Sequence, residues 1–112
     1  RPGTAPLVTM RLGGSKAGYE LLLADPVKRA NLELLIKQAI AEMLGVFFST
    51  IHIESLTPAS LIVVFYSTDP TLDLATVNEK MAAAQANPGA LFDLISVELG
   101  EPVSMESFSA EL

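Results

Sequence analysis

The sequence IHIESLTPASLIVVFY, which runs from Ile51 to Tyr66, decides the fold of this chain. In its first half isoleucines alternate with His52 and Glu54, so the two kinds of side chain fall on opposite sides of an extended chain. This alternation predicts a strand with one face on a core and the other in water. The second half, LIVVFY, is apolar on both sides, which predicts an inner strand that is covered on both faces or contacts a partner.

Pro58, Ala59 and Ser60 separate these two apolar runs. Proline and small polar residues between two strand patterns are typical of a turn, so the stretch predicts a β-hairpin. We expect the hairpin to supply the two middle strands of a sheet. The turn between its two strands is also the only place where the sequence indicates a possible reactive site.

A long helix is expected before the hairpin. Asp25 can accept hydrogen bonds from the free amides of a first helical turn, and Pro26 loses no hydrogen bond at the first helical position. The helix is predicted to run from Pro26 to about Leu44, where Gly45 can end it in a left-handed conformation. Its buried stripe consists of apolar residues three and four positions apart: Leu32, Ile36, Ala39, Ile40 and Met43.

Two further elements have recognisable patterns. Leu7 to Leu12 alternates and predicts a first strand, while Leu72 to Ala86 has the apolar period of a second helix. We expect Asp69 or Thr71 to cap that helix and Asp73 to complement its dipole.

Shorter segments lie between and after these elements. Tyr19 to Leu23 is predicted to be either a helical turn or an extended piece on the core, and Ala90 to Ile95 one further helical turn. A last strand is expected between Ser96 and Met105, where Gly100 and Pro102 interrupt the pattern.

The predicted order of elements is β-α-β-β-α-β. We therefore expect an α+β fold, a ferredoxin-like sandwich in which two helices lie on one face of a four-stranded antiparallel sheet. The whole chain, residues 1–112, is expected to form one domain with its core between about residues 7 and 105. Residues 1–6 and 106–112 are expected to be flexible ends.

Composition limits the classes of function. Half of the 112 residues are hydrophobic, and the net charge is −6 with the acidic groups spread along the chain. This argues against nucleic-acid binding, which needs clustered lysine and arginine, and against docking on anionic lipid. Because no apolar run reaches the roughly 18 residues of a membrane-spanning helix, we expect no direct membrane insertion by this domain. The chain has no cysteine, which excludes disulfides and thiolate metal sites.

A series of motifs runs in order through roughly Leu7 to Met105. They are Tyr19-x-x-Leu22-Leu23-x-Asp25, Ala30-x-Leu32-Glu33, Ile40-Ala41, Leu44-Gly45-Val46, Ile51-x-Ile53, and Leu56-x-Pro58-x-Ser60 followed by LIVVF. This progression resembles the SEA domain and SEA-like modules, which share the β-α-β-β-α-β plan.

The resemblance implies a non-enzymatic module of a larger protein, and the start at Arg1 rather than Met agrees with an excised domain. It implies extracellular or membrane-tethered surroundings and a role as a spacer, a shear-tolerant joint or an interaction surface. The sequence has no Asn-x-Ser/Thr sequon, which weakens the extracellular inference. An intracellular or cytoskeletal parent protein therefore stays open.

Self-cleaving SEA domains carry a Gly-Ser-Val-Val-Val type stretch at the hairpin turn. The resemblance implies that the serine hydroxyl attacks the preceding carbonyl, helped by backbone strain. Here Ser60 takes the serine position, but Ala59 stands where the family has glycine, which adopts a strained backbone more easily. We therefore expect a non-self-cleaving variant, and cleavage between Ala59 and Ser60 is the alternative.

Phe47 and Phe48 are the expected partner contact, because two adjacent aromatic residues at a helix-to-strand junction cannot both point inward easily. No cofactor or metal is expected: His52 is the only histidine, and a zinc site needs three or four ligands. A protein partner and self-association both stay open. A further alternative is a ferredoxin-like small-ligand-binding or dimerisation module, in which two domains pair and hold a regulatory ligand at the seam.

Overall fold

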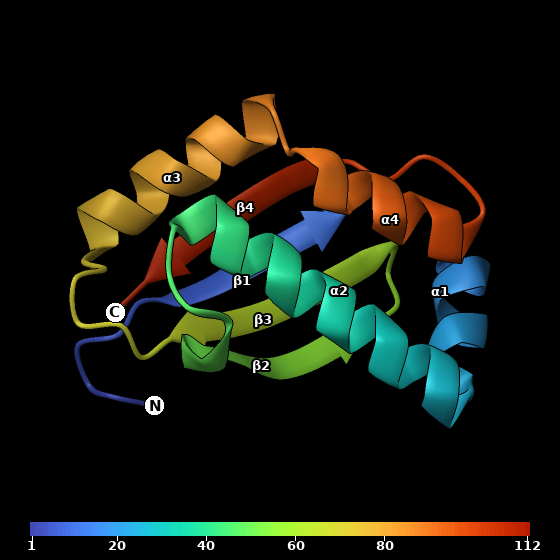
Figure 1. Cartoon of the computed structure of the whole chain (residues 1–112), viewed down its shortest axis with the longest axis horizontal. Helices are drawn as coiled ribbons and strands as arrows, with labels where there is room; N and C mark the ends of the chain where they lie inside the picture. Colours follow the sequence, from blue (N-terminus) through green and yellow to red (C-terminus); the bar gives the residue numbers. More distant parts are fainter.

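The computed structural model describes the backbone of residues 1–112 and all side chains except that of Leu91. Within the described chain, four strands form one antiparallel sheet in the order β2-β3-β1-β4 (Figure 1). The elements are β1 Leu7–Leu12, α1 Lys16–Ala24, α2 Pro26–Leu44, the short 3-10 helix η1 Phe48–Thr50, β2 Ile51–Thr57, β3 Leu61–Ser67, α3 Leu74–Ala86, α4 Ala90–Leu99 and β4 Met105–Glu111.

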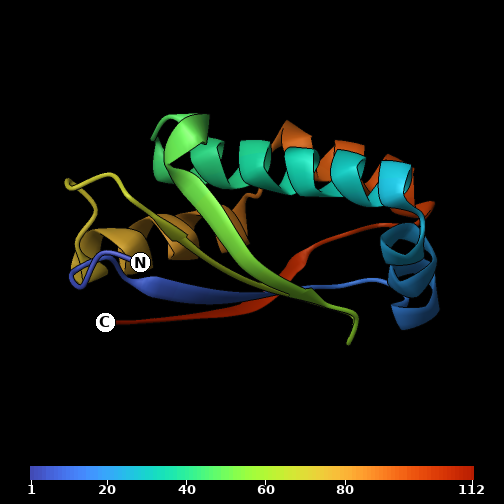
Figure 2. The ribbon, with the colours of Figure 1, turned by 90° about the horizontal axis from the view of Figure 1, so that it is seen from below.

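The α+β class and the antiparallel sheet are confirmed, but the described backbone contains four α-helices instead of two. Figure 2 shows α2, α3 and α4 on one side of the sheet, with α1 at its end. The helix-covered face of the sheet and the inner faces of the helices share a single buried apolar cluster. Tyr19, Phe65 and Phe92 are its largest fully buried side chains.

The hairpin forms as predicted, but β2 lies at the edge of the sheet and not in the middle. β1 pairs with β3 on one side and β4 on the other, so Thr9 lies opposite both Val64 and Ser109. The physical reason is visible in the two strand patterns: the strand that is apolar on both sides lies inside, and the strand that alternates lies at the edge.

A β-bulge in β2 modifies the predicted alternation. The register with β3 shifts between Ile53 and Ser55, so Glu54 is the extra residue. Beyond the bulge Leu56 lies opposite Val63 and is half-buried on the helix-covered side. His52 and Ser55, rather than His52 and Glu54, therefore share the open face.

The helices cover only one of the two faces of β3. On the helix side its residues are fully buried: Leu61, Val63 and Phe65. On the other side they are half-buried: Ile62, Val64 and Tyr66. The open face of the sheet therefore has an apolar stripe along its second strand.

α2 has the predicted bounds and caps. The carboxylate of Asp25 accepts hydrogen bonds from the amides of Val27 at 2.9 Å and Lys28 at 3.2 Å. Gly45 ends the helix with a φ of 68°, in the left-handed region that glycine adopts without a Cβ clash. Local sequence signals alone therefore fixed both ends of the longest helix.

The last strand is not between Ser96 and Met105. Its first four residues, 96–99, are the end of α4, which Gly100 ends with a φ of 80°, and residues 101–104 connect α4 to the next strand. The buried residues Phe92 and Ile95 and the half-buried Leu99 follow helical spacing. The strand is β4, and it lies in the tail that was expected to be flexible. The tail forms a strand because its apolar residues line the helix-covered face while its serines line the open face.

The cap of α3 also differs from the prediction. Asp73 is the residue that precedes the helix, and its carboxylate accepts a hydrogen bond from the Thr76 amide at 2.7 Å. Asp69 instead accepts from the amide and hydroxyl of Thr71, at 2.9 and 2.6 Å, within the preceding turn. The helix therefore begins at Leu74, two residues later than the apolar pattern predicted.

These two carboxylates give stability a dependence on pH. Hydrogen bonds from Thr71 and Thr76 hold the pKa of Asp69 and Asp73, respectively, below the ordinary 3.8. A lowered folded-state pKa stabilises the fold fully above about pH 4, and this contribution is lost as the pH falls through the lowered values. Asp73→Asn keeps a capping oxygen but does not titrate, so its urea midpoint should fall less than the wild-type midpoint between about pH 4 and pH 2. Identical acid slopes would contradict this assignment.

The region predicted as a helical turn or an extended piece is the nine-residue helix α1. Ser15 caps it by accepting from the Gly18 amide at 3.1 Å. The buried hydroxyl of Tyr19 donates to the Gly13 carbonyl at 2.6 Å and so ties α1 to the end of β1. Burial, with the nearby carboxylates of Glu101 and Glu106, raises the pKa of Tyr19, which keeps the phenol protonated as a donor.

Candidate functional site

The hairpin turn holds the two residues predicted for self-cleavage. Ser60 has a φ of 42°, a left-handed conformation that costs a non-glycine residue about 1–2 kcal/mol. The carbonyl oxygen of Ala59 accepts a hydrogen bond from Nη1 of Arg11 at 3.2 Å. The hairpin turn therefore combines a serine in an unfavourable backbone conformation with a carbonyl that is hydrogen-bonded to a guanidinium.

Arg11 reaches this corner through the pairing of distant strands. It lies opposite Ile62 in the β1–β3 ladder, one strand away from the turn. Nothing in the local sequence around Arg11 indicates this contact, because the partners are 48 residues apart. The contact between Arg11 and Ala59 could have been expected only from a prediction that β1 pairs with β3.

Phe47 and Phe48 lie at the junction between α2 and β2, where the sequence predicted an exposed contact. Phe47 is 82% exposed and Phe48 is 41% exposed. The Nζ atom of Lys37 lies 5.5 Å from the centre of the Phe48 ring, within range of a cation–π interaction. The structure therefore presents both rings at the surface and covers one of them with a cation.

His52 is exposed on the open face, as expected for a strand residue in solvent. Its ring stacks on Tyr66 with centroids 5.1 Å apart. Among the described residues, no group of three His, Cys, Asp or Glu side chains could hold a metal ion. No helix among them is long and apolar enough to cross a membrane.

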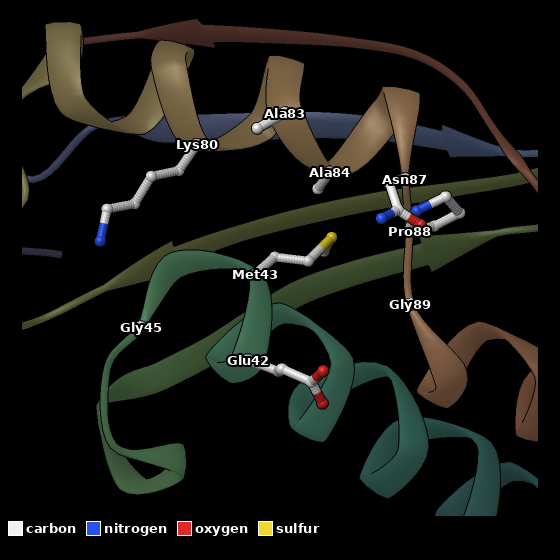
Figure 3. A pocket seen from close by; sticks show the side chains of 9 residues that line it. All are labelled: Glu42, Met43, Gly45, Lys80, Ala83, Ala84, Asn87, Pro88 and Gly89. Atoms are coloured by element: carbon white, nitrogen blue, oxygen red, sulfur yellow. The ribbon is translucent and has the colours of Figure 1, made fainter.

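A groove of about 540 Å³ that the sequence did not predict lies between the end of α2 and α3 (Figure 3). Its lining residues are Glu42, Met43, Gly45, Lys80, Ala83, Ala84, Asn87, Pro88 and Gly89. Ala84 also packs in the buried apolar cluster, so the groove lies directly above the core.

Two charged side chains border this groove. Lys80 donates from Nζ to the Leu44 carbonyl at 2.8 Å and so satisfies a free carbonyl at the end of α2. Glu42 extends from α2 toward the connection between α3 and α4 (Figure 3). The groove therefore has an apolar floor with Met43, one cation that is already hydrogen-bonded, and one exposed carboxylate.

Comparison with known proteins identifies no relative of this chain. No protein-family model, curated protein or solved structure matches the chain.

Proposed function

We propose that this chain is a non-catalytic, SEA-like module with a ferredoxin-like arrangement, acting as a structural joint and interaction surface within a larger protein. The observation that carries the proposal is the hairpin between β2 and β3. Its Pro58-Ala59-Ser60 turn opens into a long apolar strand, and that strand lies next to β1 inside the sheet. This is where the motif resemblance puts the serine of the family.

Two features support the interaction role. The Phe47 side chain is mostly exposed, so it contributes little to packing within the isolated chain. The open face of the sheet has the half-buried stripe of Ile62, Val64 and Tyr66. Exposed apolar groups that gather on one element are typical of contact surfaces.

The geometry at the turn also favours a second candidate, self-cleavage between Ala59 and Ser60. A left-handed serine stores strain, and the Arg11 guanidinium would polarise the Ala59 carbonyl. Against it, the Cβ of Ala59 restricts the backbone at the position where the family has glycine. We give this restriction the greater weight and propose an intact turn.

The purified domain should therefore remain one species with the full-length mass of 11.9 kDa. Ser60→Ala should give the same single species, because the wild-type hydroxyl does not react. Intact-mass spectrometry after prolonged incubation measures this directly. Wild-type fragments that break between Ala59 and Ser60, and that are absent in Ser60→Ala, would contradict the proposal. Ala59→Gly is the sensitised control, since cleavage in this variant alone would assign the protection to the alanine Cβ.

The groove between α2 and α3 favours a third candidate, a small-ligand regulatory module. Its volume of about 540 Å³ and its flanking charges, Lys80 and Glu42, suit a small polar molecule. Dimerisation that strengthens with a metabolite would support this role. A monomer with no ligand response would support the structural module.

A further inference from the structure

We propose that the outer edge of β2 and the groove beside it bind an extended segment of another protein, which adds to the sheet as a fifth strand. The segment has a single acidic residue with an apolar residue two positions away, on the same face of the added strand. The inference rests on the interaction role proposed above, and it names the surface and the chemistry of the partner.

The edge of β2 supplies main-chain hydrogen-bonding groups. β2 is the last strand on its side of the sheet and pairs only with β3. An edge strand leaves a row of amides and carbonyls that an added strand can satisfy. The opposite edge, β4, is less free, because Gln85 of α3 already donates to the Glu106 carbonyl at 2.9 Å.

The bulge at Glu54 decides which half of the edge can pair. It breaks the regular ladder between Ile53 and Ser55, and bulges hinder the addition of a long strand. The free run that remains next to the exposed aromatic residues is Ile51 to Ile53. A docked segment therefore pairs over a short stretch at the Phe47–Phe48 end.

A groove of about 210 Å³ runs between this edge and α2. α2 contributes three charged residues, one per helical turn: Arg29, Glu33 and Lys37. β2 contributes a continuous run of five: His52, Ile53, Glu54, Ser55 and Leu56. Side chains of an added strand would alternate between this groove and solvent, so every second residue would meet the helix charges.

The charges of the groove select an acidic partner residue at one end. Arg29 and Glu33 neutralise each other through an ion pair of 3.0 Å. In the described part of the chain Lys37 forms no ion pair, and it lies over the Phe48 ring. Lys37 can therefore receive a carboxylate, while Phe47 and Phe48 contact the apolar side chain two residues away on the same face of the added strand. Because the whole domain has a net charge of −6, a long acidic run would be repelled, which favours a single carboxylate.

A second copy of this chain fits the same edge less well. Antiparallel pairing of two copies over the run that can pair, Ile51–Ile53, would centre on His52. That run contains no acidic residue to meet Lys37 of the other copy. The edge therefore favours a different polypeptide over a homodimer.

The test uses capped peptides of about ten residues that alternate valine and threonine around one central aspartate, which is at the upper end of ordinary strand length and extends beyond the short run that pairs. A matched peptide has lysine in place of the aspartate. Titration into the isotope-labelled domain, followed by amide shifts in NMR spectra, should move the signals of Phe47, Phe48 and Ile51–Ile53. The aspartate peptide should bind about fivefold or more tightly than the lysine peptide.

Variants on α2 separate the effect of the Lys37 charge from the effect of the overall charge of the domain. Lys37→Glu should reverse the preference between the two peptides, and Lys37→Gln should abolish it. Lys28→Glu, an exposed change on the same helix but outside the groove, should leave the preference intact. Phe47→Ser should weaken both peptides without changing the urea midpoint.

Three results would overturn the inference: shifts confined to β4 or to the open face, a preference that survives Lys37→Glu, or a dimer joined through β2. None of these would refute the structural module, whose own test is the intact turn. Fragments split at Ser60 would refute that proposal whatever the peptides do.

Discussion

Phe65→Ala is expected to lower the free energy of unfolding by about 3–5 kcal/mol. Phe65 lies on the helix-covered face of β3 and is fully buried in the core beneath the helices. Removing the ring leaves a cavity that neighbouring strands and helices cannot fill, so the lost burial and the cavity both destabilise the fold. Urea unfolding followed by circular dichroism measures the change.

The adjacent residue is the matched control. Tyr66 faces the open side of the same strand and is only half-buried, with the His52 ring stacked on it. Tyr66→Ala should cost about 1 kcal/mol, because it removes one cross-strand contact and little buried area. Equal losses at the two positions would mean that both faces of the sheet are covered, which contradicts the one-sided arrangement.

Gly14→Ala is expected to cost about 2–4 kcal/mol, the second large effect. Gly14 has a φ of 122°, which side chains of L-residues rarely adopt. A Cβ at this position would lie 2.5 Å from Cδ2 of Leu99 and about 3 Å from the Tyr19 ring. The substitution therefore combines backbone strain with a clash between the β1–α1 turn and the end of α4.

Two other glycines separate these contributions. Gly100 has a φ of 80° but open space around it, so Gly100→Ala should show the backbone cost alone, about 1 kcal/mol. Gly3 has open space and no positive φ, so Gly3→Ala should change stability by less than about 0.5 kcal/mol. If Gly14→Ala proved no worse than Gly100→Ala, the close approach of α4 to the turn would be wrong.

Local signals in the sequence account for the parts of the fold that were predicted well. Asp25, Pro26 and Gly45 each act within one helical turn, and they fixed α2 at both ends. The Pro58-Ala59-Ser60 turn is equally local, and the hairpin formed as expected. The two strand patterns indicate that β3 is the inner strand, but they do not identify its second neighbour. That neighbour is β1, and the contact joins residues far apart in the sequence, such as Thr9 and Val64.

β4 was missed for a related reason. Its polar face is in solvent, and its apolar side chains, Met105, Phe108 and Ala110, become buried or half-buried only when β1 and α3 lie beside it. Taken alone, the tail has too few apolar residues to indicate a strand. The last strand was therefore expected in the segment before it, which contains Gly100 and Pro102. Gly100 is instead the left-handed residue that ends α4.

The candidate sites divide in the same way. Ser60, Phe47 and Phe48 could be singled out from sequence because turn chemistry and adjacent aromatic residues are local features. The bond from Arg11 to Ala59 and the unpaired state of Lys37 arise from tertiary contacts. Glu33 lies one helical turn from both Arg29 and Lys37, and it pairs with Arg29, which leaves Lys37 available in the groove.

The central claim is a sheet in which β1 lies between β3 and β4, helices cover one face, and β2 is a free edge. NMR contacts between backbone protons of facing strands test it most directly. This arrangement predicts cross-strand contacts from Thr9 to both Val64 and Ser109, together with fast amide exchange along the outer side of Ile51–Ile53. Contacts that place β1 beside β2, or slow exchange along that outer side in the monomer, would contradict it.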